Sequence, residues 1–304
     1  MSSAKFLSGC CANSGGARLL ISQLVGPLAP PKGKIDLIPK VVFNICAAVL
    51  LASGATPVVL AGEAAGDDLL PAQIFTRVQE NYASLESYSD EGCVATAMDG
   101  NTTIIAFTTR LARTNFYLIE WKQASESSYY VRNTSAQAVW SSGAGDFLQA
   151  ECGVQPQGNH DLALANAATF SGDAAATIPW MFFNRQWGDR GESLDDLALS
   201  EERQADEKVG NVSCYVFTGG SQGQTNTLWI GKQDFLVHQV RNVISTEAIQ
   251  SVAAKNLKIG PELIPLLRGY TSTETHTNIV LNQPFSRSDF IPSFPLFPFF
   301  YDDE

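Results

Sequence analysis

The sequence predicts a mainly β fold of the α+β class: one large curved antiparallel sheet that forms an incomplete β-barrel, with helices covering its concave face. Two observations lead to this prediction. After residue 92, most of the chain consists of short stretches with period-two alternation and close turns, which is typical of consecutive antiparallel strands. Helical patterns occur before these stretches and in two interruptions of them. Helices in such positions are expected to pack against one face of the sheet, where both can bury their apolar side chains.

The first element is a helix predicted over residues 67–88. Asp67 and Asp68 stand at its start, where negative charge is favourable in the field of the helix dipole, and Pro71 is tolerated in a first turn. Apolar residues recur at three- and four-residue spacing, as they do on one face of a helix: Leu70, Ile74, Val78, Tyr82 and Leu85.

The period-two pattern begins at Cys93. A strand over residues 93–98 runs into Asp99-Gly100, a dipeptide typical of two-residue hairpin turns, and the return strand spans residues 102–111. Further strands are predicted at residues 116–121, 129–133, 138–140, 194–199, 212–218, 225–230, 235–243 and 270–281.

Two interruptions of the strands have helical patterns. The first holds an Ala- and Leu-rich helix over residues 159–170, with Asn159 as its cap, and a very apolar segment at 178–183 that is a short helix or a loop. The second, at residues 245–268, is a helical insertion with two prolines. The Phe- and Pro-rich C-terminus is neither a regular helix nor a central strand.

Residues 1–61 are predicted to be an N-terminal extension plus signal peptide, and residues 62–304 a single domain. Residues 41–62 carry no charge and are long enough to span a membrane, which takes about 20 apolar residues. However, the dense apolar part ends at Ala52 and lysines precede it. Val59-Leu60-Ala61 fits a small-x-small cleavage site, with Gly62-Glu63-Ala64 as a second choice, and this order is typical of a cleaved secretory signal. The protein is therefore expected to be periplasmic or secreted. Retention of this segment as a membrane anchor is the alternative.

Composition limits the choice of partners and of metal sites. The chain has 31 acidic and 20 basic residues and a formal net charge of −11, which argues against nucleic acid as a partner because such a surface repels phosphates. The cysteines after the signal segment are Cys93, Cys152 and Cys214, and their spacings match no metal site. They are small buried hydrophobes, or one disulfide and a free thiol in an oxidising compartment.

One short motif is similar to a catalytic one. Residues 219–223, "GGSQG", match the G-x-S-x-G nucleophile elbow, and His238 and His276 follow Ser221 in the order that a hydrolase triad needs. The elbow requires a turn from strand to helix, whereas the next residues, "TNTLWIGK", are a predicted strand. We interpret the motif as a glycine-rich hairpin loop, and the sequence predicts no enzyme and no cofactor.

The other ionisable residues form no recognisable site. None of the three histidines pairs with another at i, i+4, so no metal site is predicted. Asp90, Glu91 and Glu120 are candidates for an acid–base pair, but we interpret them as solvated strand ends or residues of the outer face of the sheet.

Aromatic and apolar side chains are the more informative feature. They suit the walls and lid of a hydrophobic cavity, although core packing is the ordinary explanation for each of them alone. The segment at 178–183 is expected to cover the mouth of the concave face, with Phe170 and Trp140 beneath it. The predicted ligand-binding residues are Trp140, Phe170, Trp180, Met181, Phe182 and Phe183.

Several phrases resemble those of LolA-like periplasmic proteins. "AQIFTRVQENYASLESYSDEG" is similar to their opening helix and first strand. "FTTRLARTNFYLIEW" is similar to their next two strands, where a basic R-x-x-F link is usual and Thr114 replaces a common proline. "AVWSSG", "TLWIGKQDFLVHQV" and "TETHTNIVLNQPFSRSDFIPSFP" are similar to a hairpin, a pair of strands and the closing strand. The resemblance covers residues 72–295 and is greatest to an uncharacterised, predicted-periplasmic branch.

The resemblance implies an incomplete β-barrel with helices over its open, apolar side. The best-understood members ferry lipoproteins or lipids between membranes by sheltering acyl chains. The arginine with which the lipoprotein carrier anchors its lid helix corresponds here to Arg110 or Arg113.

Three hypotheses about function follow. The first is a periplasmic binding or carrier protein for acyl chains or another apolar ligand in lipoprotein or lipid trafficking. Its partners would be a lipid, an acylated protein or another apolar molecule, with transient contacts to membrane proteins. The second is a structural or sensing domain with a filled interior. The third is a serine hydrolase built on Ser221, which requires an acidic residue beside His238 and His238 beside Ser221.

Overall fold

The computed structural model describes residues 69–113, 115–123, 137–141, 143, 145–150, 153–172, 174, 177–183, 203–221, 223–256 and 262–292. The N-terminal extension, the predicted signal and the predicted strands at 129–133 and 194–199 lie outside these residues. None of the helices within them has the length and apolar character of a membrane-spanning segment.

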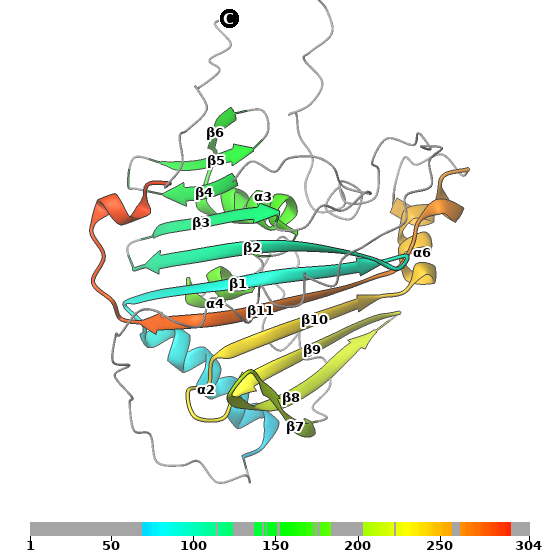
Figure 1. Ribbon diagram of the computed structural model, residues 1–304, viewed down its shortest axis with the longest axis horizontal. Coiled ribbons are helices and arrows are strands. Elements are labelled where there is room, and N and C mark those ends of the chain that lie inside the picture. The colour runs from blue at the N-terminus through cyan, green and yellow to red at the C-terminus, as the bar shows by residue number, and fades with distance from the viewer. Residues whose placement is uncertain are drawn as a thin grey trace, which may run out of the picture.

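The described strands form one antiparallel sheet of 11 strands, in the order β6-β5-β4-β3-β2-β1-β11-β10-β9-β8-β7 (Figure 1). The sheet is not closed into a barrel, and the prediction of a large antiparallel sheet with helices is confirmed. Its first half contains β1 (Ser87–Met98), β2 (Asn101–Ala112), β3 (Phe116–Gln123), β4 (Gln137–Ser141), β5 (Asp146–Ala150) and β6 (Gly153–Gln157). Its second half contains β7 (Arg203–Val209), β8 (Val212–Ser221), β9 (Gln224–Gly231), β10 (Val237–Ile244) and β11 (Tyr270–Leu281).

The last strand joins the two halves of the sheet. Within each half, every strand pairs with the strands that precede and follow it in the chain, as is usual for consecutive antiparallel strands. The turn between β1 and β2 is the predicted one: Asp99 and Gly100 have φ of 49° and 77°, as the primed turn of a two-residue hairpin requires. β11 then lies between β1 and β10, with Tyr88 opposite Leu281 and Gly92 opposite His276.

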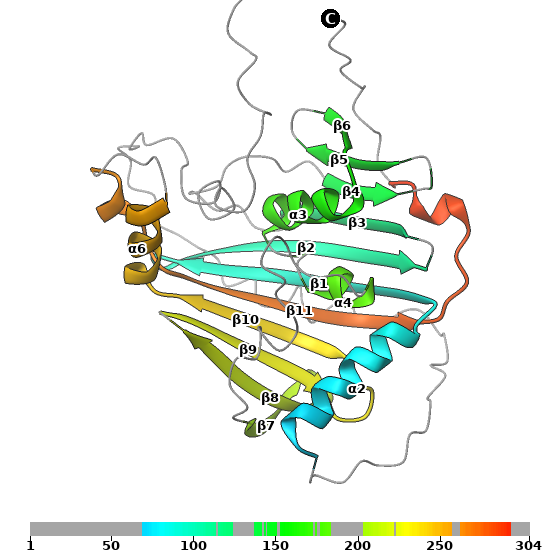
Figure 2. The ribbon, with the colours of Figure 1, turned by 180° about the vertical axis from the view of Figure 1, so that it is seen from behind.

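Three helices cover one face of the sheet, as Figure 2 shows. α2 (Pro71–Ser84) begins with Pro71 at its first position and packs Ile74, Val78 and Tyr82 into the core. α3 (His160–Ser171) is capped as predicted, since the Asn159 side chain accepts a hydrogen bond from the Leu162 N–H at 2.8 Å. α4 (Ile178–Phe182) is the short apolar segment, and it is helical.

The predicted helical insertion lies away from this face. α6 (Thr246–Asn256) and the 3₁₀ helix η3 (Ile264–Leu266) stand at one end of the sheet (Figure 1). They share a small core of their own, which contains Ile249, Ala253 and Leu267.

The predicted elements differ from the observed ones in two ways. β1 begins at Ser87, six residues before the predicted strand, so the predicted helix over residues 67–88 ends earlier, at Ser84. β5, β6 and β7 were not predicted. β6 contains Pro156, and β7 is mostly exposed and charged, so neither shows the apolar alternation of a half-buried strand.

The main core lies between the sheet and the three helices, but a second cluster packs on the opposite face. Along β3 and β4 the side chains alternate: Ile119 and Val139 belong to the main core, whereas Leu118 and Trp140 belong to the second cluster. Phe290, in the 3₁₀ helix η4 (Arg287–Phe290), covers this second cluster. Both faces of the sheet are therefore apolar at this point.

Gly92 allows a close approach between three strands. A Cβ atom at this position would lie 2.3 Å from the Phe107 ring on β2 and 2.4 Å from the Thr275 carbonyl oxygen on β11. We expect Gly92→Ala to lower the free energy of unfolding by about 1–3 kcal/mol through overpacking, as measured by chemical denaturation. Ser89→Ala, on the same strand, is the control, with an expected change within about 0.5 kcal/mol. A Gly92→Ala protein as stable as the wild type would contradict this role.

Candidate functional site

The candidate site is the part of the helix-covered face of the sheet, here called the concave face, that lies under α4. In Figure 2, α4 lies in front of β1 and β11. Its Ile178, Trp180 and Phe182 side chains are at most 5% exposed and belong to the main core. Met181 and Phe183 are half-buried and pack against the same core. Four of the six predicted site residues are therefore together in one short segment.

The two other predicted site residues lie elsewhere. Trp140 packs in the second cluster, on the opposite face of the sheet, where its ring stacks on Phe147 at 5.5 Å. Phe170 is 50% exposed near the end of α3. The prediction that both lie beneath α4 is wrong, because the alternation along β4 turns Trp140 outward and α3 directs Phe170 to its exposed side.

Arg113 holds the C-terminal end of α4 against the end of α2. Its guanidinium donates to the carbonyl oxygens of Phe182 and Tyr82, each at 2.6 Å, and to those of Leu85 and Ala83 at 2.7 and 2.9 Å. The cation also lies 4.3 Å from the centroid of the Phe182 ring. The last carbonyls of a helix have no partner within the helix, so the half-buried Arg113 guanidinium is well placed to satisfy the ends of both helices at once.

This arrangement decides between the two arginines that the sequence offered. Arg110 Nη1 donates to the Asp289 carbonyl oxygen of η4, on the other face of the sheet, at 3.1 Å. Arg113 is therefore the arginine that contacts α4.

The N-terminal end of α4 is held by a second polar contact. Thr177, which precedes the helix, does not cap it with its side chain. Instead, the Thr177 hydroxyl donates to Glu274 Oε2 on β11 at 2.8 Å. The five-residue helix is thus tied to the rest of the domain by a hydrogen bond at each end and by apolar side chains between them.

Glu274 belongs to a buried ionic cluster on the floor of the concave face. His276 Nδ1 donates to Asp90 Oδ2 at 2.6 Å, and His276 Nε2 lies 3.3 Å from Glu274 Oε1. The Tyr88 hydroxyl donates to the same Asp90 oxygen at 2.8 Å. Asp90, Glu274 and His276 are each at most 4% exposed. Among the described residues, no group of three such side chains is arranged to hold a metal ion.

The surroundings of His276 favour its charged form. Desolvation by burial lowers the pKa of His276. The negative charges of Glu274 and Asp90, and the hydrogen bonds with both carboxylates, outweigh this effect and raise the pKa to about 10. Desolvation, and then the charge of Asp90, raise the pKa of Tyr88 well above its usual value, so its hydroxyl stays a donor. The cluster therefore holds one cation between two carboxylates.

The interpretation of Asp90 as a solvated strand end is wrong. Because β1 begins at Ser87, Asp90 lies within the strand and points to the buried face, whereas Glu91 is exposed. A weak signal for the cluster exists in the sequence: Glu274 and His276 are two ionisable residues at period-two spacing, so they share one face of a strand.

Ser221 and His238 are far apart, although His238 has an acidic partner. His238 Nε2 lies 2.9 Å from Asp234 Oδ2. Ser221 on β8, however, lies opposite Gln224 on β9, and Gln224 lies opposite Ile244 on β10. His238 is at the other end of β10. Six residues of strand separate these ends by about 20 Å. The geometry of a serine hydrolase triad is not present at Ser221, which lies at a hairpin, as predicted.

Cys214 fits the first of the two interpretations of the cysteines. Its side chain is fully buried on the outer face of the sheet with Val216 and Trp229. Burial raises the pKa of the thiol to about 11, so it behaves as a small apolar group. Cys152 lies outside the described residues.

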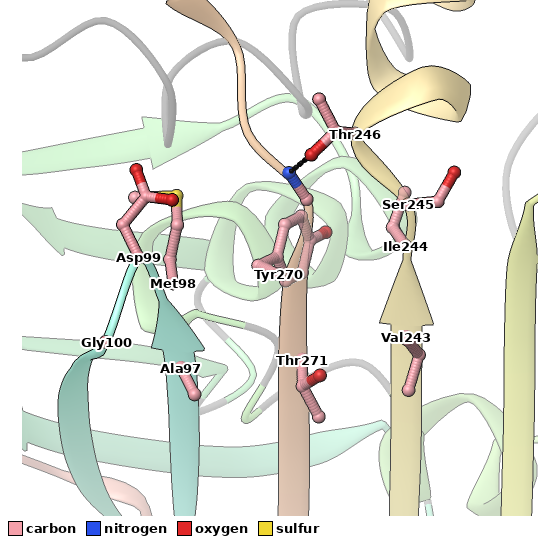
Figure 3. A pocket seen from close by; sticks show the side chains of 11 residues that line it. Ala97, Met98, Asp99, Gly100, Val243, Ile244, Ser245, Thr246, Tyr270 and Thr271 are labelled. Atoms are coloured by element: carbon pink, nitrogen blue, oxygen red, sulfur yellow. Dashed lines mark hydrogen bonds between the residues drawn. The ribbon is translucent and has the colours of Figure 1, made fainter.

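An open pocket lies at the end of the sheet near α6 and not at α4. Its volume is about 360 Å³, and it is formed by the β1–β2 turn, the β10–α6 junction and the start of β11 (Figure 3). Met98, Asp99, Thr246 and Tyr270 contribute to its wall. The pocket is shallow and half polar, so it has little in common with the predicted acyl-chain site.

Solved structures match this chain at low similarity, whereas no family model and no curated protein matches it. A DUF1329 family protein from Desulfovibrio piger is 13% identical, with a TM-score of 0.30 over 72% of this chain and 96% of that one. A LolA superfamily protein from Nitrosomonas europaea is 11% identical, with a TM-score of 0.31 over 74% and 98%. The Pseudomonas aeruginosa MucA/MucB complex contains a chain that is 9% identical, with a TM-score of 0.38 over 73% and 61%. The matches include the superfamily that the sequence phrases resemble.

Proposed function

We propose that this protein binds an apolar ligand on the concave face of its sheet and that α4 is the lid of the site. The observation that supports this most directly is the way in which α4 is held. A helix of five residues is not stable alone, so α4 depends on its apolar contacts and on the bonds of Thr177 and Arg113. A segment held by so few contacts can lift without unfolding the sheet beneath it.

The ligand would take the place of the side chains that α4 now inserts. Ile178, Trp180 and Phe182 fill the space above β1 and β11 in this structure. An acyl chain that replaces them gains about 0.8 kcal/mol for each methylene removed from water, so about ten methylenes suffice for tight binding. The chain of a lipid or of an acylated protein has this character.

The setting that fits such a carrier is the periplasm or the cell exterior. The signal-like segment before residue 62 supports this location, and the acidic surface argues against nucleic acid as a partner. A lipid or an acylated protein would be taken from and delivered to membranes, through transient contacts with membrane proteins. Catalysis plays no part in this proposal.

One observation favours the alternative, a structural or sensing domain with a filled interior. The main core is continuous from α2 through α4 to the sheet, and Phe182 within it is 0% exposed. If this packing is permanent, the fold has no room for a ligand.

Phe182→Asp separates the two functions. In a carrier, the charged side chain keeps the lid from closing over an apolar ligand, so we expect the variant to lose uptake of the dye Nile red. Its stability loss is limited to the small free energy of local opening. In a filled domain, the same substitution buries an unpaired charge and destabilises the whole domain by several kcal/mol. The measurements are dye titration and denaturation of the full chain.

Phe170→Asp is the matched control, because it adds the same charge at an exposed position of α3. We expect it to change neither dye uptake nor the unfolding midpoint. A wild-type protein that takes up no dye, together with a Phe182→Asp variant that fails to fold, would establish the filled domain instead.

A further inference from the structure

The floor beneath α4 carries more negative than positive charge. Asp90 and Glu274 are two buried carboxylates, and His276 is the one basic side chain between them. With His276 protonated the cluster carries one net negative charge. An apolar site for a plain hydrocarbon gains nothing from such a cluster, because burying charge costs free energy.

The carboxylates also have acceptor capacity that the protein does not use. Within the described residues, Asp90 Oδ1 is buried and accepts no hydrogen bond, and Glu274 Oε1 has only the 3.3 Å contact with His276 Nε2. Glu274 Oε2 accepts one, from Thr177 beside the lid. When α4 lifts, Thr177 leaves with it, and of the contacts that the described residues make with Glu274 the imidazole of His276 remains. A buried carboxylate that has lost a hydrogen bond is strongly stabilised by a new hydrogen-bond donor.

We propose that the Asp90–His276–Glu274 cluster recognises the positively charged head of an amphiphilic ligand, a primary ammonium on an alkyl chain. The ammonium N–H takes the place of the Thr177 hydroxyl at Glu274, and the alkyl chain lies where the α4 side chains lay. The charge of the cluster attracts a cation and repels a carboxylate or phosphate head, whereas a neutral hydroxyl gains only a hydrogen bond. This inference rests on the proposed function.

Three probes with the same chain test it: dodecylammonium, dodecanol and dodecanoate. Each displaces Nile red from the full chain below its micelle concentration, in physiological salt, so that attraction to the acidic surface is screened. We expect dodecylammonium to bind about tenfold more tightly than dodecanol, as one charge-assisted hydrogen bond provides, and dodecanoate to bind most weakly.

Two matched variants locate the preference. Glu274→Gln removes the buried charge and is expected to make dodecylammonium and dodecanol bind equally well, with dodecanol unchanged. Glu91→Gln removes the same charge from the exposed face of β1 and is expected to leave the preference intact. These two variants distinguish the cluster from the general acidity of the chain.

Each outcome has a distinct meaning. Equal binding of dodecylammonium and dodecanol by the wild type, or a preference that persists in Glu274→Gln, would overturn the recognition of the head while leaving the carrier function in place. Because the wild-type ranking needs no variant, the test holds even if Glu274→Gln does not fold. If none of the three probes binds, the proposed function fails, and this inference fails with it.

Discussion

His276→Leu is expected to lower the free energy of unfolding by about 3–5 kcal/mol, the usual cost of leaving a buried ion pair without one partner. The substitution leaves Asp90 and Glu274 without their cation in a site where each is 4% exposed. Among the residues that the structure describes, it also leaves the Tyr88 hydroxyl as the only donor to Asp90 Oδ2. Chemical denaturation of the full chain measures the loss.

Two controls separate charge from packing. His238→Leu removes the same residue type from a pair whose Asp234 side chain is 37% exposed, and we expect it to cost about 1 kcal/mol or less. A triple variant that places leucine at Asp90, Glu274 and His276 is expected to recover most of the stability, because it buries no charge. If His276→Leu costs no more than His238→Leu, the cluster is not the ionic floor described above.

The same cluster sets a pH dependence. The pKa of His276 is about 10 in the folded protein and 6.5 for an unperturbed histidine. Because the pKa is higher in the folded state, protonation of His276 contributes its full stabilisation to that state below pH 6.5. This contribution is lost as the pH rises through about 10. The difference in stability between the wild type and His276→Leu should therefore narrow from pH 6.5 to 10. A constant difference would show that His276 is neutral.

Arg113→Met is expected to lower the free energy of unfolding by roughly 3 kcal/mol and to release α4. Methionine keeps the apolar stem beside Phe182 but removes four hydrogen bonds to carbonyl oxygens, each from a charged donor. The loss of stability is smaller than the sum of four separate hydrogen-bond contributions, because the Ala83 carbonyl oxygen is exposed and can accept a hydrogen bond from water instead. Hydrogen exchange at the amides of residues 178–183 should become faster than in the wild type.

Arg110→Met is the control for Arg113. Arg110 lies three residues earlier and makes one hydrogen bond to a backbone carbonyl, on the opposite face of the sheet. We expect a loss of about 1 kcal/mol and no change of exchange in α4. Unchanged exchange at residues 178–183 in Arg113→Met would mean that the apolar contacts alone hold α4.

The fold class follows from local patterns, which is why the sequence predicts it. Period-two alternation depends on neighbouring residues, and so do the Asp99-Gly100 turn and the Asn159 cap. The short helix α4 and its apolar character were visible for the same reason.

The site depends on contacts between distant residues, which no local pattern contains. Asp90 and His276 are 186 residues apart and meet only because β11 pairs with β1. Trp140 shows a related difficulty. Alternation indicates that Trp140 and Val139 face opposite sides, but not which side carries the helices, because both faces of β4 are apolar.

The central place of β11 has a consequence for the order in which the protein can be assembled. During synthesis from the N-terminus, β1 to β6 and β7 to β10 can form before residues 270–281 exist, but nothing then joins β1 to β10. Two strand edges remain open until that moment, and open edges are templates for pairing with other chains. Such late, long-range joining is slow and leaves the nascent chain prone to aggregation. Two of the three members of the buried ionic cluster, Glu274 and His276, arrive with this final strand, so a chain truncated before it carries two half-sheets and only Asp90 of the cluster.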